Sequence, residues 1–295
     1  MSEKRKIVVI GAGGRLGAAL AREYASSDEV RGFTHAQLDL GQLDVLRATL
    51  APIPFDVMIN AAALTNVDYC EDHRGEALRL NAEAPQVLAA LCTEKGARFV
   101  HISTDYVFDG EKRLPYTEED PARAISVYGE SKQEGERRVL ETNDRALVVR
   151  VSWVFGPDRP SFVDAILKKA RTEEQVSAVA DKFSTPTYTL DLAAWLRPLL
   201  ASDAVGGLMH LANDGECSWQ EYAQWALDCC HEHGLPMRAR TVGAVSLGQM
   251  TNFVARRPVY TVLGTGKYER LTGEAPRDWR AAVADYVRTH YAAGD

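Results

Sequence analysis

The sequence is 295 residues long, which is enough for one large α/β domain and a smaller lobe. With 46% hydrophobic and 25% charged residues, its composition excludes a fibrous or disordered chain. The net charge is −7, from 34 Lys and Arg against 41 Asp and Glu, so we expect no nucleic-acid partner and no binding to anionic membranes. No stretch approaches the roughly 20 apolar residues of a membrane span, and the N-terminus lacks the apolar region of a signal peptide.

Short apolar runs alternate with longer helical patterns over the first half of the chain. The predicted strands are 7–10, 30–33, 57–59, 99–102 and 147–151, and the predicted helices begin at residues 16, 42, 76, 126 and 161. This alternation predicts βαβ units, and strands that are almost entirely apolar suit a sheet covered on both faces. We therefore predict an α/β protein of Rossmann type with a doubly wound parallel sheet.

After residue 151 prolines separate shorter elements, which indicates a second lobe. Its predicted elements are helices over 190–200, 218–231 and 279–291 and a strand over 208–211. Ser218 and Glu221 have the spacing of a capping box. We predict that residues 1–151 form a dinucleotide-binding domain and that residues 152–295 form mainly a smaller C-terminal substrate-binding lobe, with some segments returning to the first domain.

The cysteines indicate a reducing compartment. Their number is odd and they form no CxxC pair: Cys70, Cys92, Cys217, Cys229 and Cys230. His231 and His233 follow the last two cysteines, but this spacing is a weak metal signal, so we predict no metal site. We expect buried thiols and a cytoplasmic location.

A glycine-rich turn, GAGGRLG, directly follows the first strand and opens a helix. Such a turn points free backbone N–H groups and the positive end of the helix dipole at a pyrophosphate. The GxGxxG spacing fails at Leu16, whereas Gly11, Gly14 and Gly17 satisfy GxxGxxG, and no Walker-A lysine follows. We predict that these glycines, Arg15 and Leu16 bind a dinucleotide; the alternative is a purely structural turn.

The end of the second strand bears on the choice between NAD and NADP. An acidic residue there would hold the ribose 2′-hydroxyl, but residues 33–35 are Phe-Thr-His. Asp39 and Leu40 come later and are expected at the adenine, while Arg15 could reach a 2′-phosphate. NADPH is therefore favoured, with NADH as the alternative cofactor.

Tyr128 and Lys132 are four residues apart and share one face of the helix that begins near Ser126. The run Ser103-Thr104-Asp105 follows the fourth strand, at the sheet edge where ligands of open α/β folds bind. We predict that Tyr128 donates a proton to a reduced carbonyl group and that Thr104 orients this carbonyl. The structural alternative is an exposed Tyr and Lys on a helix.

Lys132 supplies a charge that could tune the tyrosine. A free tyrosine has a pKa of about 10 and is a poor donor at neutral pH. An ammonium at ~4 Å, with an effective dielectric of ~20, gives at most ~4 kcal/mol, or ~3 pKa units. We expect Lys132 to lower the pKa of Tyr128 towards neutrality and to bind the cofactor ribose. Tyr106 and Tyr116 are weaker candidates because neither has a lysine four residues later.

Together these motifs resemble the dTDP-4-dehydrorhamnose reductase family. The resemblance rests on the glycine turn, NAAALTNVD at 60–68, STDYVFDG at 103–110, YGESK at 128–132, SWV at 152–154 and RRP at 256–258. It implies that Ala61, Ala62 and Ala63 pass close to the cofactor. It also implies a substrate site made of Thr65, Val67, Thr104, Asp105, Tyr106, Tyr128, Trp153 and Arg257. Alternatively, Trp153 is a core aromatic and Arg257 a solvated cation.

The resemblance implies NAD(P)H-dependent reduction of the 4-keto group of dTDP-4-dehydro-L-rhamnose to dTDP-L-rhamnose. A second hypothesis is a reductase or epimerase of another nucleotide-linked deoxysugar. A third is a non-catalytic NADP-binding regulatory subunit, because the chain also resembles the β subunit of methionine adenosyltransferase. Some family members are described as dimerising through magnesium held by glutamates, one of them in the glycine loop. This chain has Arg15 there, so we predict no metal bridge and leave a homodimer open.

Overall fold

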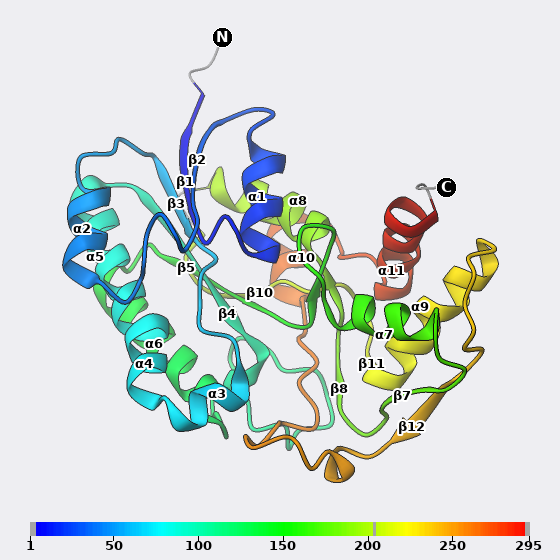
Figure 1. The fold of residues 1–295 in the computed structure, drawn as a ribbon. Coiled ribbons are helices and arrows are strands. Elements are labelled where there is room, and N and C mark those ends of the chain that lie inside the picture. The colour runs from blue at the N-terminus through cyan, green and yellow to red at the C-terminus, as the bar shows by residue number, and fades with distance from the viewer. Residues whose placement is uncertain (1–3, 203–204, 293–295) are drawn as a thin grey trace.

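A six-stranded parallel sheet forms the centre of the computed structural model, which describes residues 4–202 and 205–292 (Figure 1). Its strands are β1 (Lys6–Ile10), β2 (Glu29–Phe33), β3 (Val57–Asn60), β4 (Arg98–Thr104), β5 (Leu147–Val151) and β10 (Gly207–His210). Their order is β10-β5-β4-β3-β1-β2, and every neighbouring pair is parallel. The predicted Rossmann-type α/β fold is confirmed.

Helices cover both faces of this sheet. On one face lie α2 (Leu43–Leu50), α5 (Ala84–Lys95) and α6 (Val127–Thr142); on the other lie α1 (Arg15–Tyr24) and α8 (Thr189–Leu200) (Figure 1). Side chains alternate along a strand, so Ile7 and Val9 pack with α1 and α8, whereas Val8 and Ile10 pack on the opposite face. Burial on both faces explains why these strands read as continuous apolar runs.

The order of the strands reverses between β1 and β3. From β1 the chain pairs outward with β2, and then returns to place β3 on the other side of β1. In open α/β sheets such a switch point leaves a crevice at the carboxyl ends of the strands, where ligands bind. The glycine turn after β1 and the alanines after β3 therefore meet at this edge.

The segment between β3 and β4 is less regular than one long helix. It contains α3 (Val67–Asp72), α4 (Arg74–Leu78), a π-helical turn η1 (Arg79–Glu83) and α5. The π-helical turn packs tightly on α6, where a Cβ at Gly135 would lie 2.1 Å from the Asn81 carbonyl oxygen. The buried Asn81 side chain also accepts from the Leu64 N–H at 2.8 Å and donates to Ser131 Oγ at 2.9 Å. Asn81 thus ties the loop after β3 to α6.

A second lobe has its own core beside the sheet (Figure 1). Its elements are β6 (Val154–Phe155), α7 (Phe162–Ala170), β7 (Val176–Val179), β8 (Phe183–Ser184), β9 (Thr187–Tyr188), β11 (Cys217–Ser218), α9 (Trp219–Glu232), β12 (Val242–Val245), η3 (Leu247–Gln249), α11 (Trp279–Val287) and η4 (Arg288–Ala292). Ser218 and Glu221 form the expected capping box at the start of α9. The strand expected at 208–211 is β10, which pairs with β5 in the main sheet, and α10 (Gly266–Thr272) contacts it.

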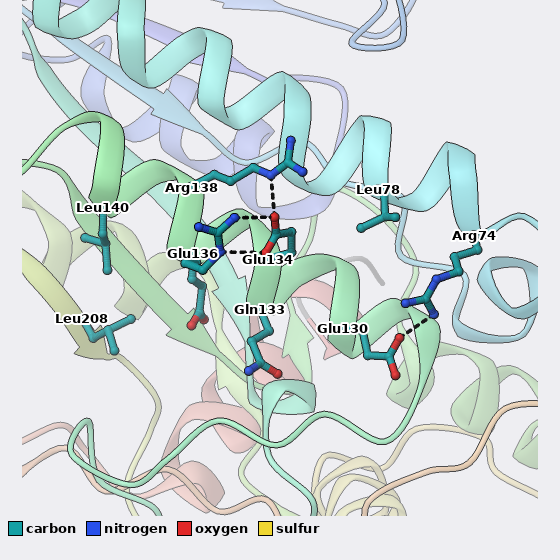
Figure 2. A pocket seen from close by; sticks show the side chains of 10 residues that line it. Arg74, Leu78, Glu130, Gln133, Glu134, Glu136, Arg138, Leu140 and Leu208 are labelled. Carbon is teal, nitrogen blue, oxygen red and sulfur yellow. Dashed lines mark hydrogen bonds and ion pairs between the residues drawn. The ribbon is translucent and has the colours of Figure 1, made fainter.

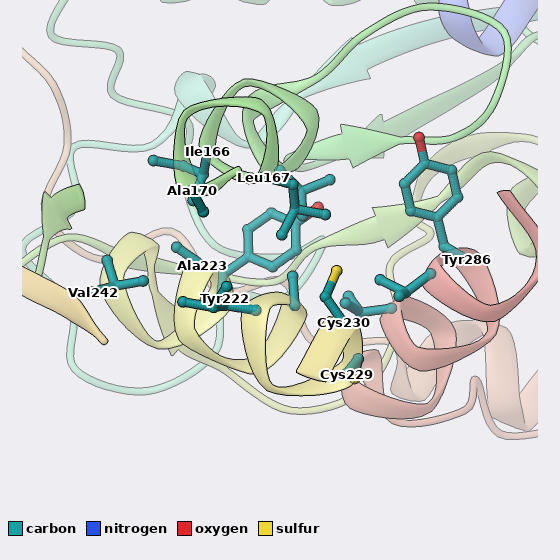
Figure 3. Close-up of a cluster of buried hydrophobic side chains, with 14 of the residues drawn as sticks. Ile166, Leu167, Ala170, Tyr222, Ala223, Cys229, Cys230, Val242 and Tyr286 are labelled. Atoms are coloured by element: carbon teal, nitrogen blue, oxygen red, sulfur yellow. The ribbon is translucent and has the colours of Figure 1, made fainter. Parts of the chain in front are cut away.

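The core of the second lobe includes several of the cysteines. Figure 3 shows Cys229 and Cys230 on α9 among side chains of α7 and α11. All five cysteines are buried, as the sequence predicted, and their thiols are free. Burial raises the pKa of both Cys229 and Cys230 to about 12, so these thiols are unreactive packing groups.

Candidate active site

A cavity of about 1250 Å³ lies at the carboxyl edge of the sheet, between the sheet and the second lobe. Phe162, Trp219 and Tyr222 line it from the second lobe. Most of the residues that the sequence predicts for the site line it: Gly11, Gly14, Arg15, Leu16, Leu40, Ala61, Ala62, Ala63, Thr65, Val67, Thr104, Asp105, Tyr106, Tyr128, Lys132 and Trp153. Three of them do not: Gly17, Asp39 and Arg257. We call this space the main cavity.

The glycine turn is built for close backbone approach. Gly11 has a φ of +83°, and a Cβ there would lie 2.8 Å from the Ala62 backbone nitrogen. A Cβ at Gly17 would lie 2.1 Å from the Gly11 carbonyl oxygen, so Gly17 shapes the turn from beneath. Because α1 begins at Arg15, the N–H groups of its first turn have no partner within the helix and are available to a phosphate. The turn fits the diphosphate of a dinucleotide.

Arg15 is engaged differently from the sequence expectation. Its guanidinium donates to the carbonyl oxygens of Arg159, at 3.1 Å, and Pro160. In return Arg159 Nε donates to the Gly13 carbonyl oxygen at 2.8 Å. The two arginines thus join the glycine turn to the second lobe, and Arg159 also lines the main cavity. Sequence reasoning missed Arg159 because a single arginine in a proline-flanked loop has no motif.

The end of β2 carries no acid into the main cavity. Thr34, His35 and Ala36 line it there. The Asp39 carboxylate instead accepts from the Gly41 N–H at 2.8 Å and the Gln42 side chain at 3.3 Å. The Gly41 hydrogen bond is the main cause that lowers the pKa of Asp39, which therefore stabilises its own turn.

Thr104 and Asp105 follow β4 and are both buried. The Thr104 hydroxyl donates to Asp105 Oδ1 at 3.1 Å and accepts from the Tyr106 N–H at 3.2 Å. The other oxygen, Oδ2, accepts from Thr261 Oγ1 at 2.5 Å and from Ser184 Oγ at 3.2 Å. Burial raises the pKa of Asp105, and the Lys182 ammonium, followed by these hydroxyl donors, partly offsets that effect. Asp105 therefore orients Thr104 and anchors β4 to the second lobe.

Tyr128 and Lys132 lie on one face of α6, capped by Ser126, and both side chains are buried, with 8% and 1% exposed. Burial raises the pKa of Tyr128, and contact with the Thr104 hydroxyl lowers it by less. Burial also lowers the pKa of Lys132 to about 8. The expectation that Lys132 brings the tyrosine pKa towards neutrality is thus wrong for the chain alone, because burial is the dominant cause and raises the pKa of Tyr128.

Lys132 has two close partners in the sheet. Its Nζ donates to the Ile102 carbonyl oxygen at 2.7 Å and lies 3.3 Å from His101 Nε2. On the far side of the ring, His101 Nδ1 lies 3.2 Å from Asn60 Nδ2. His101 and Asn60 face each other across β4 and β3, as the strand register requires. Sequence reasoning missed both, because single polar residues within apolar strands give no motif.

Trp153 shows local backbone strain at the second-lobe side of the main cavity. Its φ of +38° is unusual for a bulky residue, and such strain gathers at ligand sites. The indole stacks on Tyr222, with 6.4 Å between centroids, and its N–H is buried without a hydrogen-bond partner in the described part of the chain. The fully buried Lys182 ammonium lies 5.0 Å from the Tyr106 ring centroid and 6.0 Å from that of Trp153.

Arg257 lies outside the main cavity. It forms two hydrogen bonds with the Asp68 carboxylate, and its guanidinium lies 3.8 Å above the Phe253 ring. Phe253 packs edge-on against Trp219, which does line the cavity. Phe253 and Trp219 therefore lie between the Arg257 guanidinium and the main cavity.

A second cavity of about 640 Å³ lies on the outer side of α6 (Figure 2). Its charged side chains neutralise one another, since Arg74 pairs with Glu130 at 2.5 Å and Arg138 with Glu134 at 2.6 Å. None of the residues predicted for the site lines it. Within residues 4–202 and 205–292, no cluster of three His, Cys, Asp or Glu side chains is arranged to hold a metal ion, and no helix is long and apolar enough to cross a membrane.

Comparison with known proteins identifies the family. The model of the RmlD substrate binding domain matches residues 5–292. A probable dTDP-4,6-dihydroxy-2-methyloxan-3-one 4-ketoreductase of Streptomyces antibioticus is 36% identical, over 94% of this chain and 93% of that protein. The dTDP-4-dehydrorhamnose reductase of Burkholderia thailandensis is 34% identical, over 96% of this chain and 98% of that protein.

A solved structure agrees with these sequence relatives. The dTDP-4-dehydrorhamnose reductase of Bacillus anthracis, in complex with NADP, superposes with a TM-score of 0.90 at 30% identity, covering 96% of this chain and 99% of that one. The chain therefore belongs to the dTDP-4-dehydrorhamnose reductase family, as its motifs predicted.

Proposed function

We propose that this chain is an NADPH-dependent reductase that converts the 4-keto group of dTDP-4-dehydro-L-rhamnose to the hydroxyl group of dTDP-L-rhamnose. One observation carries the proposal: the glycine turn, Thr104, Tyr128 and Lys132 all line the same cavity. A dinucleotide phosphate site and a proton donor beside a hydroxyl are the two requirements for carbonyl reduction. Family membership supplies the substrate class.

Thr104, Tyr128 and Lys132 have different roles in the proposed reaction. When bound, the reduced nicotinamide supplies the hydride that reaches C4 of the sugar. The single Thr104 hydroxyl proton, which Asp105 Oδ1 accepts in the chain alone, would turn to the keto oxygen of the bound sugar, and Tyr128 donates the proton as negative charge develops there. Lys132 binds the cofactor ribose and stabilises the phenolate left on Tyr128. Burial of both side chains strengthens these interactions by excluding water.

The cofactor preference rests on the end of β2. The residues that line the cavity there, Thr34, His35 and Ala36, include no acid to hold a ribose 2′-hydroxyl or repel a 2′-phosphate. NADP in the Bacillus anthracis structure supports the same preference. NADH is the alternative. We place the sugar near Thr65, Val67, Tyr106 and Trp153, with Arg257 reaching its diphosphate after rearrangement.

The purified chain should oxidise NADPH only when the keto-sugar is added. Absorbance at the reduced-nicotinamide band follows the reaction, and mass measurement of the sugar product should show a gain of two hydrogens. No sugar-dependent oxidation of NADPH or NADH would contradict the reductase proposal. Tight NADPH binding without turnover would instead favour a regulatory dinucleotide-binding subunit.

A second candidate is a 4-ketoreductase of a different dTDP-linked deoxysugar. The Streptomyces antibioticus relative, named for such a sugar, is as similar to this chain as the rhamnose enzymes are. Comparing kcat/KM for the two keto-sugars separates the candidates. The free, buried thiols support a cytoplasmic location. A homodimer is a further proposal, which sedimentation of the pure protein would test.

A further inference from the structure

A chain of polar side chains runs behind the proposed catalytic pair, from β3 through β4 to α6. It links Asn60, His101 and Lys132, all of them buried. Such a buried network must satisfy every donor and acceptor, so its geometry fixes where the protons lie.

The orientation of the Asn60 amide is set by the turn after β3. Asn60 Oδ1 accepts from the Ala62 N–H at 3.1 Å. Turning the amide over would place its NH₂ group against that N–H and lose the bond. Asn60 Nδ2 therefore donates to His101 Nδ1 at 3.2 Å, and the Nδ1 atom carries no proton.

The protonation of His101 follows from this contact. Burial, together with the nearby Lys132 ammonium, holds the pKa of His101 well below its ordinary value, so the ring is neutral. A neutral ring with an unprotonated Nδ1 carries its proton on Nε2. That N–H faces Lys132 Nζ at 3.3 Å.

This contact favours one charge state of Lys132. An uncharged amine has a lone pair that accepts from His101 Nε2–H, and it still donates to the Ile102 carbonyl oxygen at 2.7 Å. A proton added to Nζ would use that lone pair, so the hydrogen bond from His101 would be lost and two N–H groups would face each other. Glu136 on α6 acts in the opposite direction and favours the ammonium.

The other charged groups around the network are already paired. Glu136 accepts from Arg150 on β5 at 2.9 and 2.6 Å and from Ser103 at 2.5 Å. Tyr128, on the same helix as Lys132, is held neutral by burial. The His101 donor is therefore the group in direct contact with Nζ that opposes its charge.

We propose that His101, held by Asn60 in its Nε2–H tautomer, is a positioning residue that sets the charge with which Lys132 meets the cofactor. Only the effect of His101 on catalysis rests on the proposed function. The tautomer itself is a property of the free protein. When Lys132 Nζ takes up a proton, it loses the hydrogen bond that it accepts from His101. The charge of Lys132 is therefore sensitive, near neutral pH, to the groups that contact Nζ.

Nitrogen-15 NMR of the histidine rings tests the tautomer in the chain without cofactor. We expect the His101 signals, assigned by their loss in His101→Phe, to show a protonated Nε2 and an unprotonated Nδ1 from pH 6 to 9. A protonated Nδ1, or an imidazolium at neutral pH, would overturn the proposal. The tautomer is read from the spectrum of the wild-type protein, and the variant is used only to assign the His101 signals. His231→Phe, on α9 in the second lobe, is the matched control for assignment.

NADPH binding followed by fluorescence tests the effect on Lys132. In the wild type, we expect affinity to fall as the pH rises through about 8, the pKa of Lys132, because the ammonium is lost. In His101→Phe the fall should move up by about one pH unit, since the opposing donor is gone. His231→Phe should leave the pH at which NADPH affinity falls unchanged. An unchanged pH dependence in His101→Phe would refute the role. Neither readout uses the sugar, so a failed reductase assay would leave this inference standing.

Discussion

Arg257 and Asp68 form a two-pronged ion pair that joins the C-terminal part of the chain to α3 at the rim of the main cavity. The guanidinium nitrogens donate to the two carboxylate oxygens at 2.9 and 2.6 Å. The N–H groups of Val254 and Ala255 also donate to Asp68, at 2.8 and 2.9 Å. Asp68 is next to Val67, which lines the cavity. The ion pair thus holds the segment 254–257 beside the proposed sugar site.

Replacing Arg257 should mainly weaken substrate binding. If the guanidinium reaches the sugar diphosphate, Arg257→Ala should raise KM for the nucleotide sugar by about tenfold or more, because a charge-assisted hydrogen bond is lost. The value of kcat should change much less. Steady-state kinetics at saturating NADPH measure both. Its exposed neighbour offers the control, since Arg256→Ala should leave KM nearly unchanged. Equal effects of the two variants would argue against a specific role.

The same ion pair should make stability depend on acidity. Hydrogen bonds from Arg257 lower the pKa of Asp68 to about 2, below the unfolded value of about 3.9. The pair's contribution to the free energy of unfolding is therefore complete above about pH 4 and is lost as the pH falls through about 2. Denaturant unfolding should show Asp68→Asn less stable than the wild type at pH 7, with a smaller gap at pH 3. A constant gap would contradict this.

Tyr128→Phe should abolish proton donation and leave the cofactor site intact. Loss of a general acid costs ~10²–10⁴ in rate. The removed hydroxyl is needed for turnover, whereas the glycine turn and Lys132 remain, so NADPH affinity should stay close to that of the wild type. Single-turnover absorbance measures the reaction rate, and fluorescence titration measures the NADPH affinity. Tyr116→Phe removes another buried phenol, one that bonds Asp109, and should retain activity. A wild-type rate in Tyr128→Phe would mean that the proton comes from elsewhere.

Gly17→Ala should damage the glycine turn although Gly17 does not line the main cavity. The added Cβ would lie 2.1 Å from the Gly11 carbonyl oxygen, so the backbone must shift. We expect a loss of ~1–3 kcal/mol in the free energy of unfolding and weaker NADPH binding. Gly75→Ala on α4 is the control, because a Cβ there meets nothing within 4 Å. Thermal and denaturant unfolding should show Gly17→Ala to be less stable than Gly75→Ala. Equal stability of the two variants would contradict the predicted clash at Gly17.

Arg159→Ala should weaken the cofactor site from the second-lobe side. Its side chain lines the main cavity and bonds the Gly13 carbonyl oxygen. Removing it should reduce NADPH affinity about tenfold, equivalent to ~1.4 kcal/mol, because one charged hydrogen-bond donor is lost. Arg47→Ala serves as the control, since Arg47 pairs with Glu94 on the exposed surface of α2 and α5. Unchanged affinity in Arg159→Ala would show that the glycine turn alone holds the diphosphate.

The sequence by itself determined the parallel sheet and the members of the proposed catalytic group. Apolar runs separated by helical patterns identify strands buried on both faces, and their order places the ends of β1, β3 and β4 at one edge. The spacing of Tyr128 and Lys132 fixes them on one helix face. Local periodicity and spacing suffice for these features, because they are properties of short stretches of chain.

Only the tertiary structure decided which charges are free and which are paired. Arg257 was expected at a diphosphate but bonds Asp68, 189 positions away in sequence, and Arg15 bonds carbonyl oxygens of the second lobe. The pKa of Tyr128 is raised because burial outweighs the hydrogen bond with Thr104, which lowers it. Such outcomes depend on desolvation and on partners distant in sequence, and neither is encoded in a local pattern. The contact between His101 and Lys132 likewise exists only once β4 and α6 are packed together.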